Sequence, residues 1–224
     1  MEEKKKSWVK KIVVIIVLAI AIIWIVTIGR KWIILNNLYQ KTSAYNMETN
    51  YYKKIIHYSG TSVIIEDIYR KENQEFKKTA ILQSNEKLQT YTDGIEKIDI
   101  QIRDTEKTAT IQKIEEGKYT ELEGDLLVSK NAFNRLWQSI QCTIKEEKCN
   151  GVSCYFIDFG ENYKAWVDKE NYLIVREANG SFIDAKGEEY SSIRDVKYKI
   201  GTITDEDVKK PELTEEYIIT EKVQ

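Results

Sequence analysis

The chain contains 224 residues, 42% of them hydrophobic and 31% charged, with 34 Lys and Arg against 36 Asp and Glu. This nearly neutral balance argues against a nucleic-acid partner, which would need a basic face. A single His and three Cys argue against His-rich metal enzymes, and a single Pro excludes collagen-like or Pro-rich disordered classes. The length suits one or two folding units with a sizeable core.

An apolar run at residues 12–29 predicts a membrane-spanning helix. The run has no charge and no Pro, and Thr27 is its only polar residue. At 1.5 Å per residue it spans about 27 Å, close to the thickness of a hydrocarbon core. Trp8 and Trp32 flank the run, where indole rings favour the membrane interface. The other interpretation, a buried core helix, fits an uncharged run of this length poorly.

The charges on either side of the run predict the orientation of the helix across the membrane. Five Lys precede it, whereas only Arg30 and Lys31 follow closely, so the N-terminus is expected in the cytoplasm. The run is longer than a signal-peptide core and no A-x-A-like site follows it, which favours an uncleaved anchor over a removed signal peptide. We therefore predict a basic cytoplasmic tail at residues 1–11 and a transmembrane anchor at residues 12–32.

The rest of the chain is expected outside the cell, and it is acidic. Residues 33–224 carry 27 basic and 34 acidic residues, a net charge of −7, which disfavours electrostatic attraction to anionic lipid. Residues 33–49 have roughly helical apolar spacing and predict a stalk, either continuous with the anchor or broken near Asn36 and Asn37.

Beyond residue 50 the pattern changes to strands. The dipeptide Asp93-Gly94 predicts a two-residue hairpin turn. Ile98, Ile100 and Ile102 then alternate with polar residues, as in an antiparallel sheet with one covered face. Further strands are expected on both sides of this segment and again from residue 141 to residue 200, with a hairpin at Asn150-Gly151.

One helix is expected to interrupt the strands. Phe133, Leu136, Trp137 and Ile140 recur at helical spacing after Asp125, a plausible N-cap, and this stripe is expected to lie on the sheet. We predict a single extracytoplasmic domain of α+β class at residues 50–204. The charged segment at residues 205–224 is expected to be a loose tail.

The segment from residue 163 to residue 177, YKAWVDKENYLIVRE, resembles the WIDKET-x-LPVRE signature of the LolA/LolB-like superfamily of outer-membrane lipoprotein carrier-like domains. This superfamily includes Gram-positive envelope lipoproteins and the N-terminal domain of RseB/MucB regulators. The resemblance implies a curved antiparallel sheet, an unclosed barrel, with one or two helices packed on it and a cavity that holds acyl chains in several members. Ile174 stands where the family usually has Pro, and the predicted spanning helix disfavours a freely moving shuttle.

Motifs for enzymatic chemistry are missing from the sequence. His57 has no partner His and no nearby nucleophile, and the sequence contains no G-x-S-x-G, H-E-x-x-H, Walker A or G-x-G-x-x-G motif. We therefore predict a non-enzymatic protein with no cofactor and no metal site. The apolar side chains expected to line a ligand cavity, or alternatively only to fill a core, are Ile98, Ile100, Ile102, Phe133, Trp137, Phe156 and Trp166.

Three cysteines lie within 13 residues of one another in a segment expected to face an oxidising exterior. Their spacing matches no common zinc pattern. Cys149 and Cys154 are expected to face each other across a hairpin, so a disulfide between them is predicted, with Cys142 left free.

These observations predict a single-pass membrane protein of a Gram-positive-type bacterium. Its partners would be the bilayer, through residues 12–32, and an apolar ligand such as a lipid or acyl chain. The alternative function is a regulatory or scaffold domain that binds another envelope protein, as the RseB/MucB branch implies.

Overall fold

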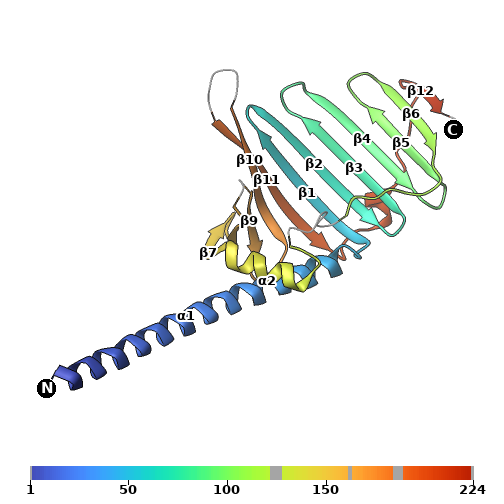
Figure 1. The fold of residues 1–224 in the computed structure, drawn as a ribbon. Helices are drawn as coiled ribbons and strands as arrows, with labels where there is room; N and C mark the ends of the chain where they lie inside the picture. Colours follow the sequence, from blue (N-terminus) through green and yellow to red (C-terminus); the bar gives the residue numbers. More distant parts are fainter. Residues whose placement is uncertain (1, 122–127, 161–162, 184–188, 223–224) are drawn as a thin grey trace.

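A computed structural model describes residues 2–121, 128–160, 163–183 and 189–222 of the chain. It consists of a long N-terminal helix, a large twisted sheet and a short second helix (Figure 1). The helices are α1 (Glu2–Tyr45) and α2 (Ala132–Gln141), and a short 3₁₀ helix, η1, covers Asp205–Val208. The strands are β1 (Asn50–Ser59), β2 (Ser62–Lys71), β3 (Gln74–Ile81), β4 (Glu86–Asp93), β5 (Ile98–Arg103), β6 (Thr108–Lys113), β7 (Thr143–Cys149), β8 (Val152–Asp158), β9 (Tyr163–Asp168), β10 (Ile174–Ile183), β11 (Glu189–Ile200) and β12 (Ile218–Lys222).

Helix α1 is continuous over 44 residues and does not break near Asn36 and Asn37. Its segment Lys11–Tyr45 is long and apolar enough to cross a membrane. The hydroxyl of Thr27 donates to the carbonyl of Ile23 at 2.8 Å, which satisfies the one polar side chain of the apolar run without a partner outside the helix.

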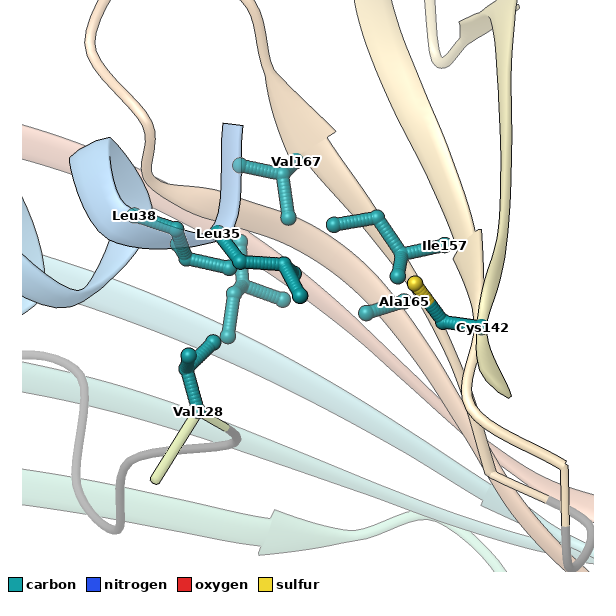
Figure 2. Packing of buried hydrophobic residues seen from close by; sticks show 8 residues of the cluster. Leu35, Leu38, Val128, Cys142, Ile157, Ala165 and Val167 are labelled. Carbon is teal, nitrogen blue, oxygen red and sulfur yellow. The ribbon is translucent and has the colours of Figure 1, made fainter. Parts of the chain in front are cut away.

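The last turns of α1 belong to the core of the sheet domain. Leu35 and Leu38 are fully buried and pack against Val128 and the inward side chains of β8 and β9, including Ile157 and Ala165 (Figure 2). The apolar run of α1, by contrast, is exposed between residues 12 and 26. One helix therefore contributes both the predicted span and part of the domain's own packing.

The sheet is mixed and unclosed, in the order β12-β6-β5-β4-β3-β2-β1-β11-β10-β9-β8-β7. Two antiparallel meanders, β1 to β6 and β7 to β11, are joined by the long pairing of β1 with β11, from Tyr51↔Ile200 to Tyr58↔Ile193. Only β12 runs parallel to its neighbour, β6. The expected curved, unclosed antiparallel sheet preceded by an apolar helix is confirmed, apart from this added parallel strand.

Two of the expected turns can be compared with the structure. Asn150-Gly151 forms a two-residue hairpin in which Cys149 pairs with Val152, and both turn residues have positive φ. The two-residue turn predicted at Asp93-Gly94 is wrong, because Asp93 pairs with Ile98. There the carboxylate of Asp93 accepts hydrogen bonds from the backbone of Ile95 and Glu96, which stabilises a four-residue turn instead.

The two faces of the sheet have different covers. Strand alternation and register place Tyr51, Ile55, Ile157 and Ala165 on one face, here called the helix face, which packs against α1. The opposite face is called the tail face. There, Tyr91, Ile100, Ile102 and Ala109 form a separate buried cluster, covered by Leu213 and Tyr217 of the C-terminal segment.

The second helix is present, but its apolar stripe does not face the sheet as expected. Helix α2 begins after the N-cap Asn131, whose side chain accepts from the backbone of Phe133 and Asn134, whereas Asp125 lies outside the described residues. Its apolar stripe does not lie on the sheet: Phe133, Leu136, Trp137 and Ile140 are all exposed.

The C-terminal segment is packed along much of its length rather than loose. Val208 in η1 is 1% exposed, and η1 lies against β2 and β3. The hydroxyl of Tyr217 donates to Asp104 at 2.8 Å, and β12 then adds to the edge of the sheet. The segment is charged overall, but Leu213 and Tyr217 pack on the tail face, whereas Ile218 and Ile219 of β12 are exposed.

We expect Val208→Asp to lower the free energy of unfolding by about 3 kcal/mol or more, because it places an unpaired carboxylate in a buried apolar site. The matched control Glu206→Ala changes an exposed residue of the same helix and should stay within about 0.5 kcal/mol of the parent. Urea unfolding of the full chain in detergent, followed by near-ultraviolet circular dichroism, measures both. Equal stabilities would contradict a packed tail.

Candidate binding groove between β10 and β11

The structure separates the seven side chains that were expected to share one cavity. Ile98, Ile100 and Ile102 contribute to the tail-face cluster beneath Leu213 and Tyr217. The protein's own chain therefore covers this cluster, and Ile102 also lines a hollow of about 390 Å³ on the tail face, together with Phe76 and Tyr217.

The aromatic residues among the seven lie in two other places. Phe156 and Trp166 pack against each other on the tail face of β8 and β9, with ring centroids 5.0 Å apart, and the Trp166 indole donates to Glu147. Phe133 and Trp137 lie on α2, which packs against α1 instead. Neither pair contributes to the cluster around Ile100.

A different hollow lies where β10 and β11 diverge. The register of these strands runs from Ile183↔Glu189 to Arg176↔Asp195. Towards Ile200, β11 continues along β1, while β10 follows β9. The resulting groove has a volume of about 380 Å³.

A β-bulge at Val175 accounts for the divergence. On β9, Val167 and Trp166 are adjacent, but their partners on β10 are Ile174 and Arg176, so Val175 is the extra residue. A bulge bends its strand and re-aims the local side chains. Val175 therefore lines the groove at the point where the two strands part.

The floor of the groove is apolar. Leu173 and Val196 are 4% and 2% exposed and belong to the buried cluster with Tyr51, Ile55 and Ile68. Val152 and Val175 extend this apolar lining. Because the floor is part of the core packing, its shape is fixed by the fold rather than by exposed loops.

The rim of the groove is mainly cationic. Lys54, Lys197 and Lys199 line it on the side of β1 and β11. Lys54 lies 3.7 Å from Asp67, and the ammonium of Lys199 lies 5.9 Å from the ring centroid of Tyr52. Such a rim suits an anionic group at the mouth of an apolar hollow.

The polar residues on the other side of the rim stabilise a turn. Asp168 accepts hydrogen bonds from the backbone of Glu170 at 2.8 Å and from the side chain of Asn171 at 2.9 Å. Asn171 in turn accepts from the backbone of Leu173 at 2.8 Å. These groups hold the turn between β9 and β10, and thereby the start of the strand that carries the bulge.

The sole His of the chain is part of a charged row on the helix face. His57 lies 3.2 Å from Glu66, which also pairs with Lys77 at 2.5 Å. The hydrogen bond from His57, together with Lys77, lowers the pKa of Glu66 to about 2 despite its burial. This arrangement links β1, β2 and β3 through side chains and contains no nucleophile.

The three cysteines are buried free thiols in the structure. The two-residue turn places Cys149 opposite Val152 and Cys154 opposite Glu147, so the expected direct opposition of the two cysteines is wrong. They lie diagonally on one face, where Cα atoms are typically about 7–8 Å apart, beyond the usual disulfide range. Their pairing stays a prediction. No group of three or more metal-ligating side chains occurs among the described residues.

Sequence reasoning missed the groove because a bulge leaves little trace in the pattern. The signals available were the two lysines after Tyr52 in Tyr52-Lys53-Lys54 and the alternation of basic and aromatic residues in Lys197-Tyr198-Lys199. Their meaning depends on β1 and β11 being neighbours, which the sequence order alone does not indicate.

Comparisons with known proteins give likenesses of fold. No protein-family model matches the chain, and no curated protein matches it significantly. Among solved structures, an uncharacterized conserved protein from Thermus thermophilus is 11% identical with a TM-score of 0.46, over 84% of this chain and 98% of that one. MucB in the complex structure of Pseudomonas aeruginosa MucA/MucB is 8% identical with a TM-score of 0.39, over 77% of this chain and 59% of that one.

A crystal structure of MucB alone gives the same result, at 11% identity and a TM-score of 0.38, over 80% of this chain and 63% of that one. The chain thus spans less than two thirds of these MucB chains. MucB belongs to the branch that the sequence resemblance named, but likenesses this distant assign no activity or partner to the present chain.

We expect Cys154 in the reduced, folded protein to react with iodoacetamide roughly a hundredfold more slowly than an unperturbed thiol at pH 8. Burial raises the pKa of this thiol to about 11, and only the thiolate reacts. Mass spectrometry of timed samples measures the rate. The urea-unfolded protein is the control, and rapid labelling of Cys154 before unfolding would contradict the buried thiol.

The same measurement without reductant tests the disulfide. If Cys149 and Cys154 are linked in protein purified from an oxidising exterior, the unfolded chain takes up one alkyl group, on Cys142. Uptake of three groups would refute the pairing.

Proposed function

We propose that the chain is a membrane-anchored, non-enzymatic binding protein whose extracytoplasmic domain holds an amphiphile with an apolar chain and an anionic head. The observation that carries this proposal is the groove between β10 and β11, with its buried apolar floor and cationic rim. Its volume of about 380 Å³ falls within the range of small-ligand pockets, near the lower end.

The chemistry of the groove supports binding rather than catalysis. Contact with Leu173, Val175 and Val196 would remove apolar ligand surface from water at about 25 cal/mol per Å². Lys197 and Lys199 at the mouth attract a carboxylate or phosphate. Asp168 is already held by the turn, so it supports the wall of the groove and is assigned no part in proton transfer.

The anchor determines where this groove operates. We propose that residues 1–11 are cytoplasmic, that residues 12–32 span the membrane, and that residues 33–49 form a helical stalk. Residues 50–204 would form the extracytoplasmic domain, and residues 205–224 would form its C-terminal segment. The continuity of α1 from Glu2 to Tyr45 supports this arrangement, since the stalk is the outer end of the spanning helix.

Filling the groove should abolish ligand binding. We expect Val175→Trp to weaken binding of 11-(dansylamino)undecanoic acid by at least about tenfold, or about 1.4 kcal/mol, because the indole occupies the apolar lining. Val63→Trp, in β2 and outside the groove lining, is the matched control and should leave affinity unchanged. Fluorescence titration of the full chain in nanodiscs measures both.

The cationic rim is tested with the same probe. Lys197→Gln should weaken binding of the acid but not of its methyl ester, whereas Lys87→Gln, an exposed lysine elsewhere on the tail face, should affect neither. Absence of saturable binding to the unaltered chain, or equal effects of Val175→Trp and Val63→Trp, would refute the ligand site. A regulatory or scaffold domain that binds another envelope protein would then be the better proposal.

Topology is tested independently of the ligand. Protease added to spheroplasts should digest residues 33–224 and leave a fragment that contains residues 1–29, because the excess of Lys before the apolar run favours a cytoplasmic N-terminus. Mass spectrometry identifies the protected fragment. Protection of the domain, or a mature chain that begins after residue 29, would contradict the anchor as proposed.

A further inference from the structure

Helix α2 is amphipathic, but its polar side faces the protein and its apolar side faces outward. Phe133 and Trp137 are 72% and 55% exposed, and Leu136 and Ile140 are exposed on the same side. Arg135 and Ser139, by contrast, are 7% and 0% exposed. In a soluble domain the opposite orientation is the rule, so this apolar stripe requires an apolar environment outside the protein.

The orientation of α2 is fixed by hydrogen bonds from its buried side. One terminal nitrogen of the Arg135 guanidinium donates to the carbonyls of Ser129 and Lys130 at 2.9 and 2.8 Å, and the other donates to Asn36 of α1 at 3.2 Å. The same guanidinium lies 4.2 Å from the ring centroid of Tyr39. Turning the apolar stripe inward would break these interactions and leave a buried charge unpaired.

A second contact fixes the other end of α2. Lys31 of α1 donates to the carbonyl of Cys142, the C-cap of α2, at 2.7 Å. Since Arg135 lies at Asn36 and Cys142 lies at Lys31, α2 runs against the direction of α1, as Figure 1 shows. Its C-terminal end is therefore the end nearest the apolar run of α1.

The depth of α2 follows from the helical rise. Lys31 and Asn36 lie two and seven residues beyond Gly29, which is about 3 Å and about 10 Å along the axis of α1. Each headgroup layer of a bilayer is roughly 5–8 Å thick, so the end of α2 that carries Trp137 and Ile140 lies at headgroup depth. Trp favours that layer. On α1 itself, Ile33 is exposed at the same level and continues the apolar surface.

We propose that α2 is a second membrane contact, in which the C-terminal part of the apolar stripe, with Trp137 and Ile140, inserts into the interface of the outer leaflet beside α1, while Phe133 lies at its outer edge. This inference rests on the proposed anchoring by α1. The bilayer is the occupant that the structure favours, because the stripe continues the apolar surface of the spanning helix and every copy of the chain brings that bilayer with it. The net charge of −7 on residues 33–224 makes the contact apolar rather than electrostatic.

Nitroxide labels on single introduced cysteines test the proposal. Trp137→Cys and Phe133→Cys report on α2, and Trp24→Cys reports on the span. Ile95→Cys is the matched control, because Ile95 is 73% exposed in the turn between β4 and β5. The full chain is reconstituted in phosphatidylcholine vesicles, and the accessibility of each label to oxygen and to a water-soluble nickel chelate is measured. The unsubstituted chain gives the background from its buried cysteines.

We expect the ratio of oxygen to nickel accessibility to be highest at position 24 and lowest at position 95. Position 137 should give a ratio several-fold above that of position 95, and position 133, farther from the apolar run of α1, a ratio between the two; neither should change when phosphatidylglycerol is added. A label at 24 in lipid with a label at 137 as accessible to nickel as position 95 would overturn the contact and leave the anchor intact. A label at 24 in water would overturn the anchor and this inference with it. A label at position 137 that is shielded from both oxygen and the nickel chelate, and that shows spin–spin broadening which disappears on dilution with unlabelled chain, would mean that a second copy of the chain covers the stripe. That result would overturn the proposal.

Discussion

The burial of Leu35 and Leu38 of α1 within the core of the sheet domain is the contact on which the remaining arrangement depends. These side chains pack on Ile157, Ala165 and Val167, so the helix that is apolar enough to span a membrane is also part of the domain's interior. A flexible linker would let the domain turn freely above the membrane. Here the packing of one continuous helix fixes the direction of the sheet relative to that helix.

The same contact explains why the sheet needs two separate covers. Helix α1 reaches only the helix face, at β1 and β2 and at β8 to β10. Tyr91, Ile100, Ile102 and Ala109 of β4 to β6 point to the opposite face, where Tyr91 and Ile100 would be exposed without Leu213 and Tyr217. The C-terminal segment thus completes a core that the helices do not reach. Within the second meander, the bulge at Val175 opens the groove between β10 and β11.

Local patterns in the sequence predicted local structure well. The uncharged run at residues 12–29 indicated the apolar helix, and the alternation of Ile98, Ile100 and Ile102 indicated a strand with one buried face. What alternation does not specify is which element covers that face. Placing the apolar stripe of α2 on the sheet was wrong, and the residues that do cover these isoleucines, Leu213 and Tyr217, come from a segment too charged to suggest a core.

The candidate site was less predictable for a related reason. Helical spacing identified Phe133 and Trp137 as one side of a helix. An amphipathic pattern does not show whether its apolar side faces the core or the surroundings, and in a membrane-attached protein the apolar side need not face the core. The groove residues Leu173, Val175 and Val196 come together only through the bulge and the pairing of β1 with β11. Both are consequences of tertiary structure, and neither has a local sequence signature as clear as a turn.

Because α1 is unbroken, each residue along it also sets the angle at which the attached domain is rotated about the helix axis. Each residue of an α-helix turns the chain by about 100° and advances it by about 1.5 Å. One residue added between Gly29 and Lys31 would leave the domain's packing intact, yet it would swing the whole sheet about the helix axis. Four added residues would nearly restore the original angle, about 6 Å farther from the bilayer. For a membrane-spanning α1, the rotation of the helix at the point where the domain begins, and not only the length of the helix, would decide which side of the domain faces the lipid.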